Sequence, residues 1–63
     1  MHVRVVPNNG DVVGLADRLV AAGHDSVYVL WDSVVFVPFA EPFGFDWIGA
    51  VEAHFGCSVR EVG

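Results

Sequence analysis

Histidine and cysteine are the residues in this sequence with the clearest potential for chemistry. His54 and Cys57 lie three positions apart, while His2 and His24 lie elsewhere in the chain. A zinc site takes about four ligands, usually from two close pairs, and a cysteine nucleophile needs a neighbouring base and an oxyanion site. One His and Cys pair is too small a set for either. We therefore expect no catalytic residue, no metal and no cofactor, and an enzyme or metal protein that uses His54 and Cys57 is only the third alternative.

Carboxylates dominate the charge of the chain. Eight Asp and Glu residues stand against three arginines and no lysine, which gives a net charge of −5. Binding to a phosphate backbone needs clustered Lys and Arg, so we expect no direct nucleic-acid ligand and favour a basic protein partner. The acidic residues expected on one surface are Asp11, Asp17, Glu41, Asp46 and Glu52. Spaced carboxylates can imitate nucleic-acid phosphates in a cationic groove, or can simply keep a surface solvated.

A β-hairpin at residues 26–39 is the element around which the rest of the chain is organised. Two runs rich in Val, Tyr, Trp and Phe flank the polar pair Asp32 and Ser33. If those two residues form the turn, Trp31 stands opposite Val34. Both faces of the hairpin are apolar in every register, whereas an antiparallel sheet in a small domain usually has one wet face. We therefore expect that both faces are covered or that one is an interaction surface.

The remaining elements follow from periodicity and from turn residues. A strand is expected at residues 2–6, a helix that begins after the N-cap Asp11 and ends before Gly23, a second helix at residues 47–55 after the N-cap Asp46, and a final strand at residues 57–62. This β-α-β-β-α-β order predicts an α+β, ferredoxin-like fold with a four-stranded antiparallel sheet and two helices on one face. The first and third strands would be central, and the other face would be open.

Length and composition predict one small domain over residues 1–63. A chain of 63 residues with 54% hydrophobic residues can bury one core. Its single cysteine cannot form an internal disulfide, and no stretch has the character of a signal peptide or of a membrane helix. We expect a cytoplasmic protein.

The open face of the expected sheet offers a second candidate surface. With Val3 and Val59 directed toward the helices, Arg4 and Arg60 point outward and could flank Tyr28 or Phe36. The residues expected to bind a partner or a second copy on this face are Tyr28, Leu30 and Phe36. Aromatic residues beside arginines on an open sheet are typical of single-stranded RNA binding. The aromatic and glycine signature of the RNA-recognition motif is absent, however, and the net charge is of the wrong sign. A small homodimeric regulatory or structural module that pairs through this face is the alternative to an acidic binding protein.

A small, acidic, single-domain chain without a catalytic constellation resembles the inhibitor proteins that phages and mobile elements encode against host nucleases, including the anti-CRISPR proteins. The resemblance covers size, charge and the lack of a catalytic motif. It implies a non-enzymatic inhibitor that binds a basic, nucleic-acid-handling complex and blocks it by occlusion.

Overall fold

Four strands and two helices are present in the computed structural model, which describes residues 1–38 and 44–63. In chain order they are β1 (Val3–Pro7), α1 (Val12–Ala21), β2 (Asp25–Val29), β3 (Val34–Val37), α2 (Trp47–Phe55) and β4 (Cys57–Val62). The expected order of elements is confirmed, and the bounds of α2 and β4 agree with the sequence prediction to the residue. Within the described ranges, no helix has the length and apolar character needed to cross a membrane.

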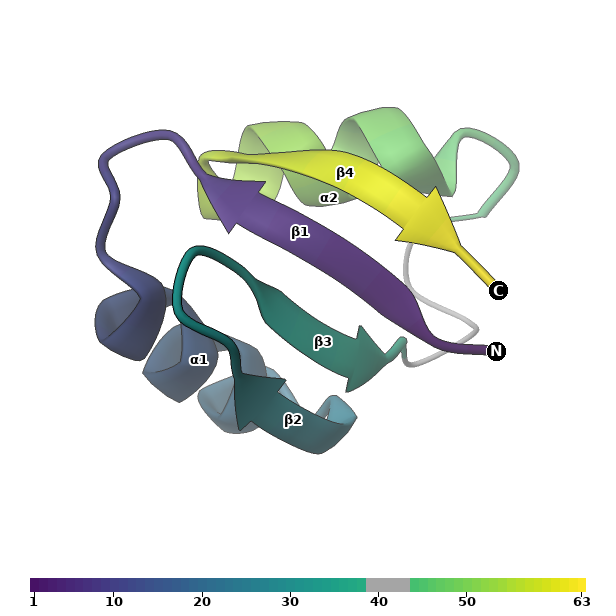
Figure 1. Cartoon of the computed structure of the whole chain (residues 1–63). Coiled ribbons are helices and arrows are strands. Elements are labelled where there is room, and N and C mark those ends of the chain that lie inside the picture. Colours follow the sequence, from purple (N-terminus) through teal and green to yellow (C-terminus); the bar gives the residue numbers. More distant parts are fainter. Residues whose placement is uncertain (39–43) are drawn as a thin grey trace.

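The strands form one antiparallel sheet in the order β2-β3-β1-β4. β1 pairs with both β3 and β4, so β1 and β3 are the central strands, as expected, and β2 and β4 are the edges. Both helices lie against the same face of the sheet (Figure 1), α1 beside β2 and β3 and α2 beside β4. No described element covers the opposite face. The small α+β architecture with an open antiparallel sheet is therefore confirmed.

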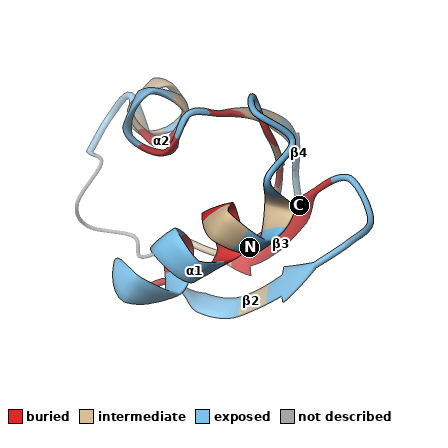
Figure 2. Cartoon of the chain, turned by 90° about the vertical axis from the view of Figure 1, so that its left-hand side faces the viewer, coloured by how far each residue is buried: buried red, intermediate tan, exposed pale blue. Residues whose placement is uncertain are grey.

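A row of paired valines crosses all four strands, and its two central members, Val5 and Val34, are fully buried in the core. Val29 pairs with Val34, Val34 with Val5, and Val5 with Val59. Directly opposed residues share one face of a sheet, and here it is the face that packs against the helices. We call Val29, Val34, Val5 and Val59 the inner row. Burial is concentrated at the central strands and at the inward sides of the helices, while β2 is mostly exposed (Figure 2).

Helix α1 begins where Asp11 caps it. The Asp11 carboxylate accepts a hydrogen bond of 3.0 Å from the Gly14 backbone N–H, and the apolar stripe Leu15, Ala16 and Leu19 is buried. Glycine inside a helix normally costs about 1 kcal/mol relative to alanine. Here a Cβ at position 14 would collide with the Asp11 carboxylate as it lies in the cap, so an alanine at this position would require the Asp11 side chain to shift.

Both edge strands are blunted against pairing with another strand. In β2 the register shifts between Asp25 and Tyr28, and Ser26 has a φ of 52°, which is unusual for a residue other than glycine. In β4 the backbone N–H of Val59 donates a 2.9 Å hydrogen bond to Glu52 of α2. A bulge and a side chain on an edge donor both hinder edge-to-edge association. Each edge strand thus has one feature that hinders pairing, and the sheet face opposite the helices is covered by no described element.

The hairpin turn lies one residue earlier in the chain than the sequence indicates. Val29, and not Trp31, stands opposite Val34, because a hydrogen bond joins Leu30 to Ser33 and leaves Trp31 and Asp32 at the centre of the turn. The predicted pairing was therefore wrong by two positions. A shift of two residues preserves the alternation of side chains, so the partition of the hairpin into two faces is unchanged.

Phe36 does not belong to the open face. Its side chain is 0% exposed and lies in the core. Side chains alternate along β3, so Phe36 shares the inward face with Val34, while Val35 between them points outward. The expectation that Phe36 contributes to an outward surface was wrong for this reason.

Candidate functional site

The candidate site is a second row of residues on the open face of the sheet. Tyr28 pairs with Val35, Val35 with Arg4, and Arg4 with Glu61, so one residue from each strand contributes. We call these four residues the outer row. It lies one residue away from the inner row along each central strand, on the opposite face. Tyr28 is 51% exposed, as the sequence prediction requires for a surface residue.

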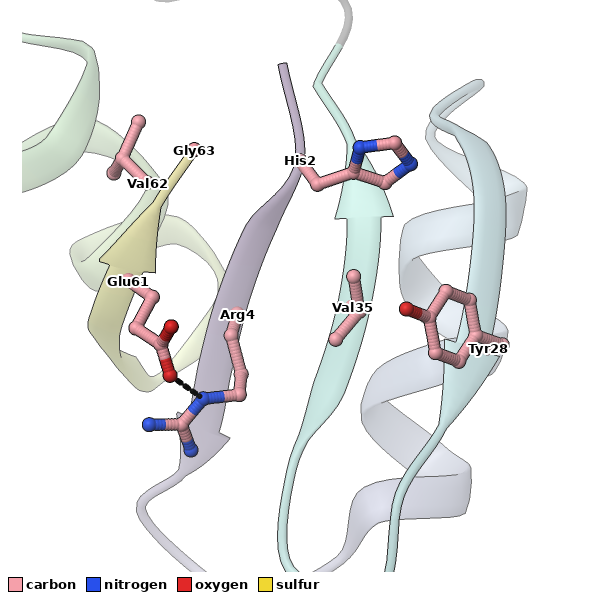
Figure 3. Close-up of a pocket in the computed structure, with 7 residues that line it drawn as sticks. All are labelled: His2, Arg4, Tyr28, Val35, Glu61, Val62 and Gly63. Carbon is pink, nitrogen blue, oxygen red and sulfur yellow. Dashed lines mark hydrogen bonds and ion pairs between the residues drawn. The ribbon is translucent and has the colours of Figure 1, made fainter.

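A shallow hollow of about 250 Å³ lies over this row (Figure 3). Val35 forms an apolar floor, and the Tyr28 ring and the Arg4 guanidinium group lie on either side of it. His2 and Val62 complete the wall on the side of the chain ends. The hollow thus combines an apolar floor with a phenol, an imidazole and the ion-paired side chains of Arg4 and Glu61, a set that suits a flat apolar group.

An ion pair fixes the cation of the hollow. Arg4 Nε donates to Glu61 Oε1 at 2.8 Å. A register shift between Arg4 and Val5 in the pairing of β1 with β4 sets Glu61, and not Arg60, opposite Arg4. The pair offsets the positive charge that RNA binding would use, but only Nε of the guanidinium group is engaged. Within the described residues, the two Nη groups form no hydrogen bond to a side chain or to the backbone.

The two ends of the chain form one wall of the hollow. The His2 N–H donates to the Gly63 carbonyl at 2.7 Å, and the Gly63 N–H donates to the His2 carbonyl at 2.8 Å. These two bonds extend the pairing of β1 with β4 beyond the strands. The wall is therefore held by the sheet and does not hang free.

The tip of the hairpin presents a tryptophan to solvent. Trp31 is 91% exposed. Two hydrogen bonds hold the turn that carries it: the Leu30 N–H donates to the Ser33 carbonyl at 2.8 Å, and the buried Ser33 hydroxyl donates to Asp32 at 3.1 Å. Leu30, which we expected on the open face, is part of this turn and is 40% exposed. A rigid turn with a bare indole is a candidate contact point in its own right.

The expected acidic residues are less concentrated than the sequence suggests. Asp11 is the N-cap of α1 and Asp46 that of α2. Because α1 follows β1, α2 follows β3, and these strands are antiparallel, the two caps lie at opposite ends of the sheet. Asp17 is exposed on α1 and has neither a described hydrogen bond nor an ion pair. Of these three carboxylates, Asp17 and Asp46 are without a described side-chain partner.

The other two members of the expected acidic set differ in status. Glu52 is only partly exposed, and its carboxylate accepts the hydrogen bond from Val59 described above. It therefore has a structural role in closing the edge of the sheet. Glu41 lies outside the described residues.

Cys57 and His54 do not form a reactive pair in this structure. Cys57 is buried in the core, and its thiol donates a long contact of 3.9 Å to the Val51 carbonyl. Burial, and after it the Glu52 carboxylate, raises the pKa of the thiol to about 11, while Arg18 opposes the rise. A thiol in this state is a small hydrophobe, and thiolate chemistry is suppressed. No group of three or more His, Cys, Asp or Glu side chains suited to a metal ion occurs among the residues that the structure describes.

His24 is a buried polar residue that the sequence reasoning missed. Its ring packs edge-on against Phe36, with a centroid distance of 5.0 Å, and against Phe55 at 5.7 Å. Burial lowers the pKa of His24, nearby His54 lowers it further, and Asp25 opposes the shift. The sequence signal was its position directly after the glycine that ends α1, where the chain turns back toward the core.

Comparisons with known proteins do not suggest a function for this chain. No protein-family model matches the sequence, and searches of the curated proteins and of the solved structures give no significant match. Contacts, burial and charge are the basis for the function proposed next.

Proposed function

We propose that this protein is a non-enzymatic binding protein that occupies the cationic surface of a nucleic-acid-handling complex and blocks it by occlusion. The uncompensated charge carries the proposal. Seven of the eight carboxylates lie in the described ranges, and within those ranges only Glu61 forms an ion pair. The negative charge is thus not neutralised inside the fold. It is available to steer association with a basic partner and to set its specificity.

The partner class follows from the same charge. A surface that carries spaced carboxylates and no lysine repels nucleic acid and fits a groove lined by Lys and Arg, which is the kind of groove that binds a phosphate backbone. An inhibitor of the anti-CRISPR kind, acting in the cytoplasm, would use such a surface. Asp17 and Asp46 are its best candidates, since neither side chain is engaged in a described side-chain hydrogen bond.

We infer further that the architecture is ferredoxin-like. The support is the β-α-β-β-α-β order, the central positions of β1 and β3, and the placement of both helices on one face. In that architecture the helices cover one face of the sheet and leave the other for contacts. The acidic helices and the open sheet would then be two separate surfaces.

The experiment measures target-DNA binding by a panel of purified CRISPR effector complexes with increasing amounts of the protein. We expect at least one complex to lose DNA binding, and less so at high salt, because salt screens exposed charges. In that complex, the double variant Asp17→Lys with Asp46→Lys should raise the inhibitory concentration at least about tenfold, equivalent to about 1.4 kcal/mol.

The matched control places the same change in net charge elsewhere. The double variant Asp25→Lys with Asp32→Lys alters two exposed carboxylates of the hairpin region, outside the expected acidic set. It should shift the inhibitory concentration less than about threefold, because local complementarity and not total charge determines the contact. An equal loss in both variants, or intact DNA binding in every complex, contradicts the proposal.

A further inference from the structure

We propose that Asn9 is a site of spontaneous deamidation, at which the folded chain converts a side-chain amide into a carboxylate just before α1. Asn8 and Asn9 are the only side-chain amides in the sequence, which contains no glutamine, and Asn9 alone precedes a glycine. The turn that carries them joins β1 to α1 and takes no part in the function proposed above. The two proposals therefore stand separately.

The nucleophile is the backbone nitrogen of Gly10. Gly10 is exposed and has a φ of 74°, and a Cβ built at this position would meet no atom beyond its chain neighbours within 4 Å. The nitrogen therefore has no side chain of its own and no packed group to crowd it. Its N–H donates to the Pro7 carbonyl at 3.2 Å, at the long end of the range for such bonds. Loss of this proton breaks one weak hydrogen bond within the turn.

The electrophile is the side-chain carbonyl carbon of Asn9, which a hydrogen bond holds near the backbone. Asn9 Oδ1 accepts a 3.0 Å hydrogen bond from the Asp11 backbone N–H. This bond closes a ring that contains the Gly10 backbone, so the amide is folded toward the nitrogen that attacks it. The same N–H stabilises the negative charge that develops on Oδ1 during the attack.

The reaction balances with water as the only co-reactant. The Gly10 nitrogen, after losing its proton to water, bonds to Asn9 Cγ, and the side-chain nitrogen leaves with a proton from solvent as ammonia. The succinimide ring so formed adds water at either of its carbonyl carbons. Opening at Cγ gives aspartate, whereas opening at the main-chain carbonyl gives isoaspartate, whose backbone runs through the former side chain. Either product makes the net charge one unit more negative than −5.

Asn8 provides an internal comparison, because the fold engages it differently. Its backbone N–H donates to the Gly56 carbonyl at 2.9 Å, and its Oδ1 accepts a 3.4 Å hydrogen bond from the Ser58 hydroxyl. The Asn8 amide thus contacts β4 and not the backbone that follows it. The next residue, Asn9, also carries a side chain that crowds its nitrogen. Asn8 should therefore react at least about tenfold more slowly than Asn9.

Isoelectric focusing and peptide mass mapping of the full chain test the site. The folded protein is incubated at mildly alkaline pH in heavy-oxygen water, so that the oxygen added on hydrolysis labels the residue that reacted. Cleavage after Arg4 and Arg18 releases both asparagines in one peptide, and fragmentation of that peptide distinguishes them. We expect an acidic form to accumulate, with the label at residue 9.

Two matched variants and a urea series complete the test. Asn9→Gln should stop formation of the acidic form, because its longer side chain closes a larger and slower ring, whereas Asn8→Gln should leave the rate unchanged. Below the unfolding transition, urea should not alter the rate, because the folded turn is the reacting species. A rate that follows the unfolded fraction overturns the proposal, as does a label at residue 8 or the absence of an acidic form. Circular dichroism verifies that both variants fold.

Discussion

The inner and outer rows of the sheet have the same backbone and opposite chemistry. They are adjacent along the central strands and differ only in the face to which their side chains point. The inner row is valine in all four strands, whereas the outer row contains a phenol, a valine, a guanidinium group and a carboxylate. Alternation along a strand thus separates the residues that stabilise the fold from those that are free to recognise something else. Substitutions on the two faces should therefore have different consequences.

The largest expected difference is between two aromatic residues. Phe36→Ala should lower the free energy of unfolding by about 3–5 kcal/mol, because it leaves a cavity in the core. A 63-residue domain has only about 3–9 kcal/mol in total, so this variant should lose about a third or more of the stability of the fold. Tyr28→Ala on the open face should cost less than about 1 kcal/mol. Urea titrations followed by circular dichroism measure both values, and similar losses would show that the two faces are not distinct.

A smaller effect is expected from pH, and it belongs to the helix-covered face. His24 has its ordinary pKa of 6.5 in the unfolded chain and a lowered pKa in the fold, so between these values the unfolded state binds more protons. Stability is therefore complete above pH 6.5 and falls as the pH drops below it. Urea midpoints at about pH 7.5 and about pH 5.5 should differ in the native chain.

The control for this pH effect is His24→Leu, which removes the buried imidazole and keeps the other two histidines. The drop in the urea midpoint between the two pH values should shrink in this variant. Carboxylates contribute equally to both proteins and cancel in the comparison. An identical pH dependence in the two would mean that burial between Phe36 and Phe55 does not control His24.

The smallest effect is expected in the outer row itself. Glu61→Gln removes the ion pair with Arg4, which is partly exposed, and should lower the free energy of unfolding by less than about 1 kcal/mol. The difference should fade at high salt. Asp32→Asn removes an equivalent charge without breaking an ion pair, so it should not destabilise the chain. If Glu61→Gln lowers the free energy of unfolding by well over about 1 kcal/mol, the outer row also stabilises the fold, and the two faces are not distinct in role.

Local patterns were sufficient for the elements of this fold. The cap at Asp11, the apolar stripe behind it and the glycine after α1 are all signals that act within a few residues, and the structure has each of them in place. The same holds for α2, which ends at Gly56 in a left-handed conformation. The inward face of β1 was also predicted correctly, because Val3 and Val5 lie on either side of the polar Arg4 and therefore point to the same face.

Features that depend on register or on distant contacts could not be predicted. Apolar residues continue on both sides of Asp32, so the pattern does not indicate whether the two central residues of the turn are Asp32 and Ser33 or Trp31 and Asp32. The hydrogen bond from Leu30 to Ser33 decides it. The hollow depends on a register shift that brings Glu61 opposite Arg4, and no local signal marks that shift. The scattering of the acidic residues likewise follows from the antiparallel placement of the helices.

The reciprocal hydrogen bonds between His2 and Gly63 also determine how the molecule can be rewired. Because His2 and Gly63 lie side by side, a short linker could join the two ends of the chain, and the chain could be reopened at the turn of the hairpin without moving a strand. Such a circular permutant would free the turn that carries Trp31. It would also join covalently the two chain ends that form the wall of the hollow. By the same geometry, a tag fused to either end emerges at the rim of that hollow, so a cleavable tag is the appropriate choice for any binding study.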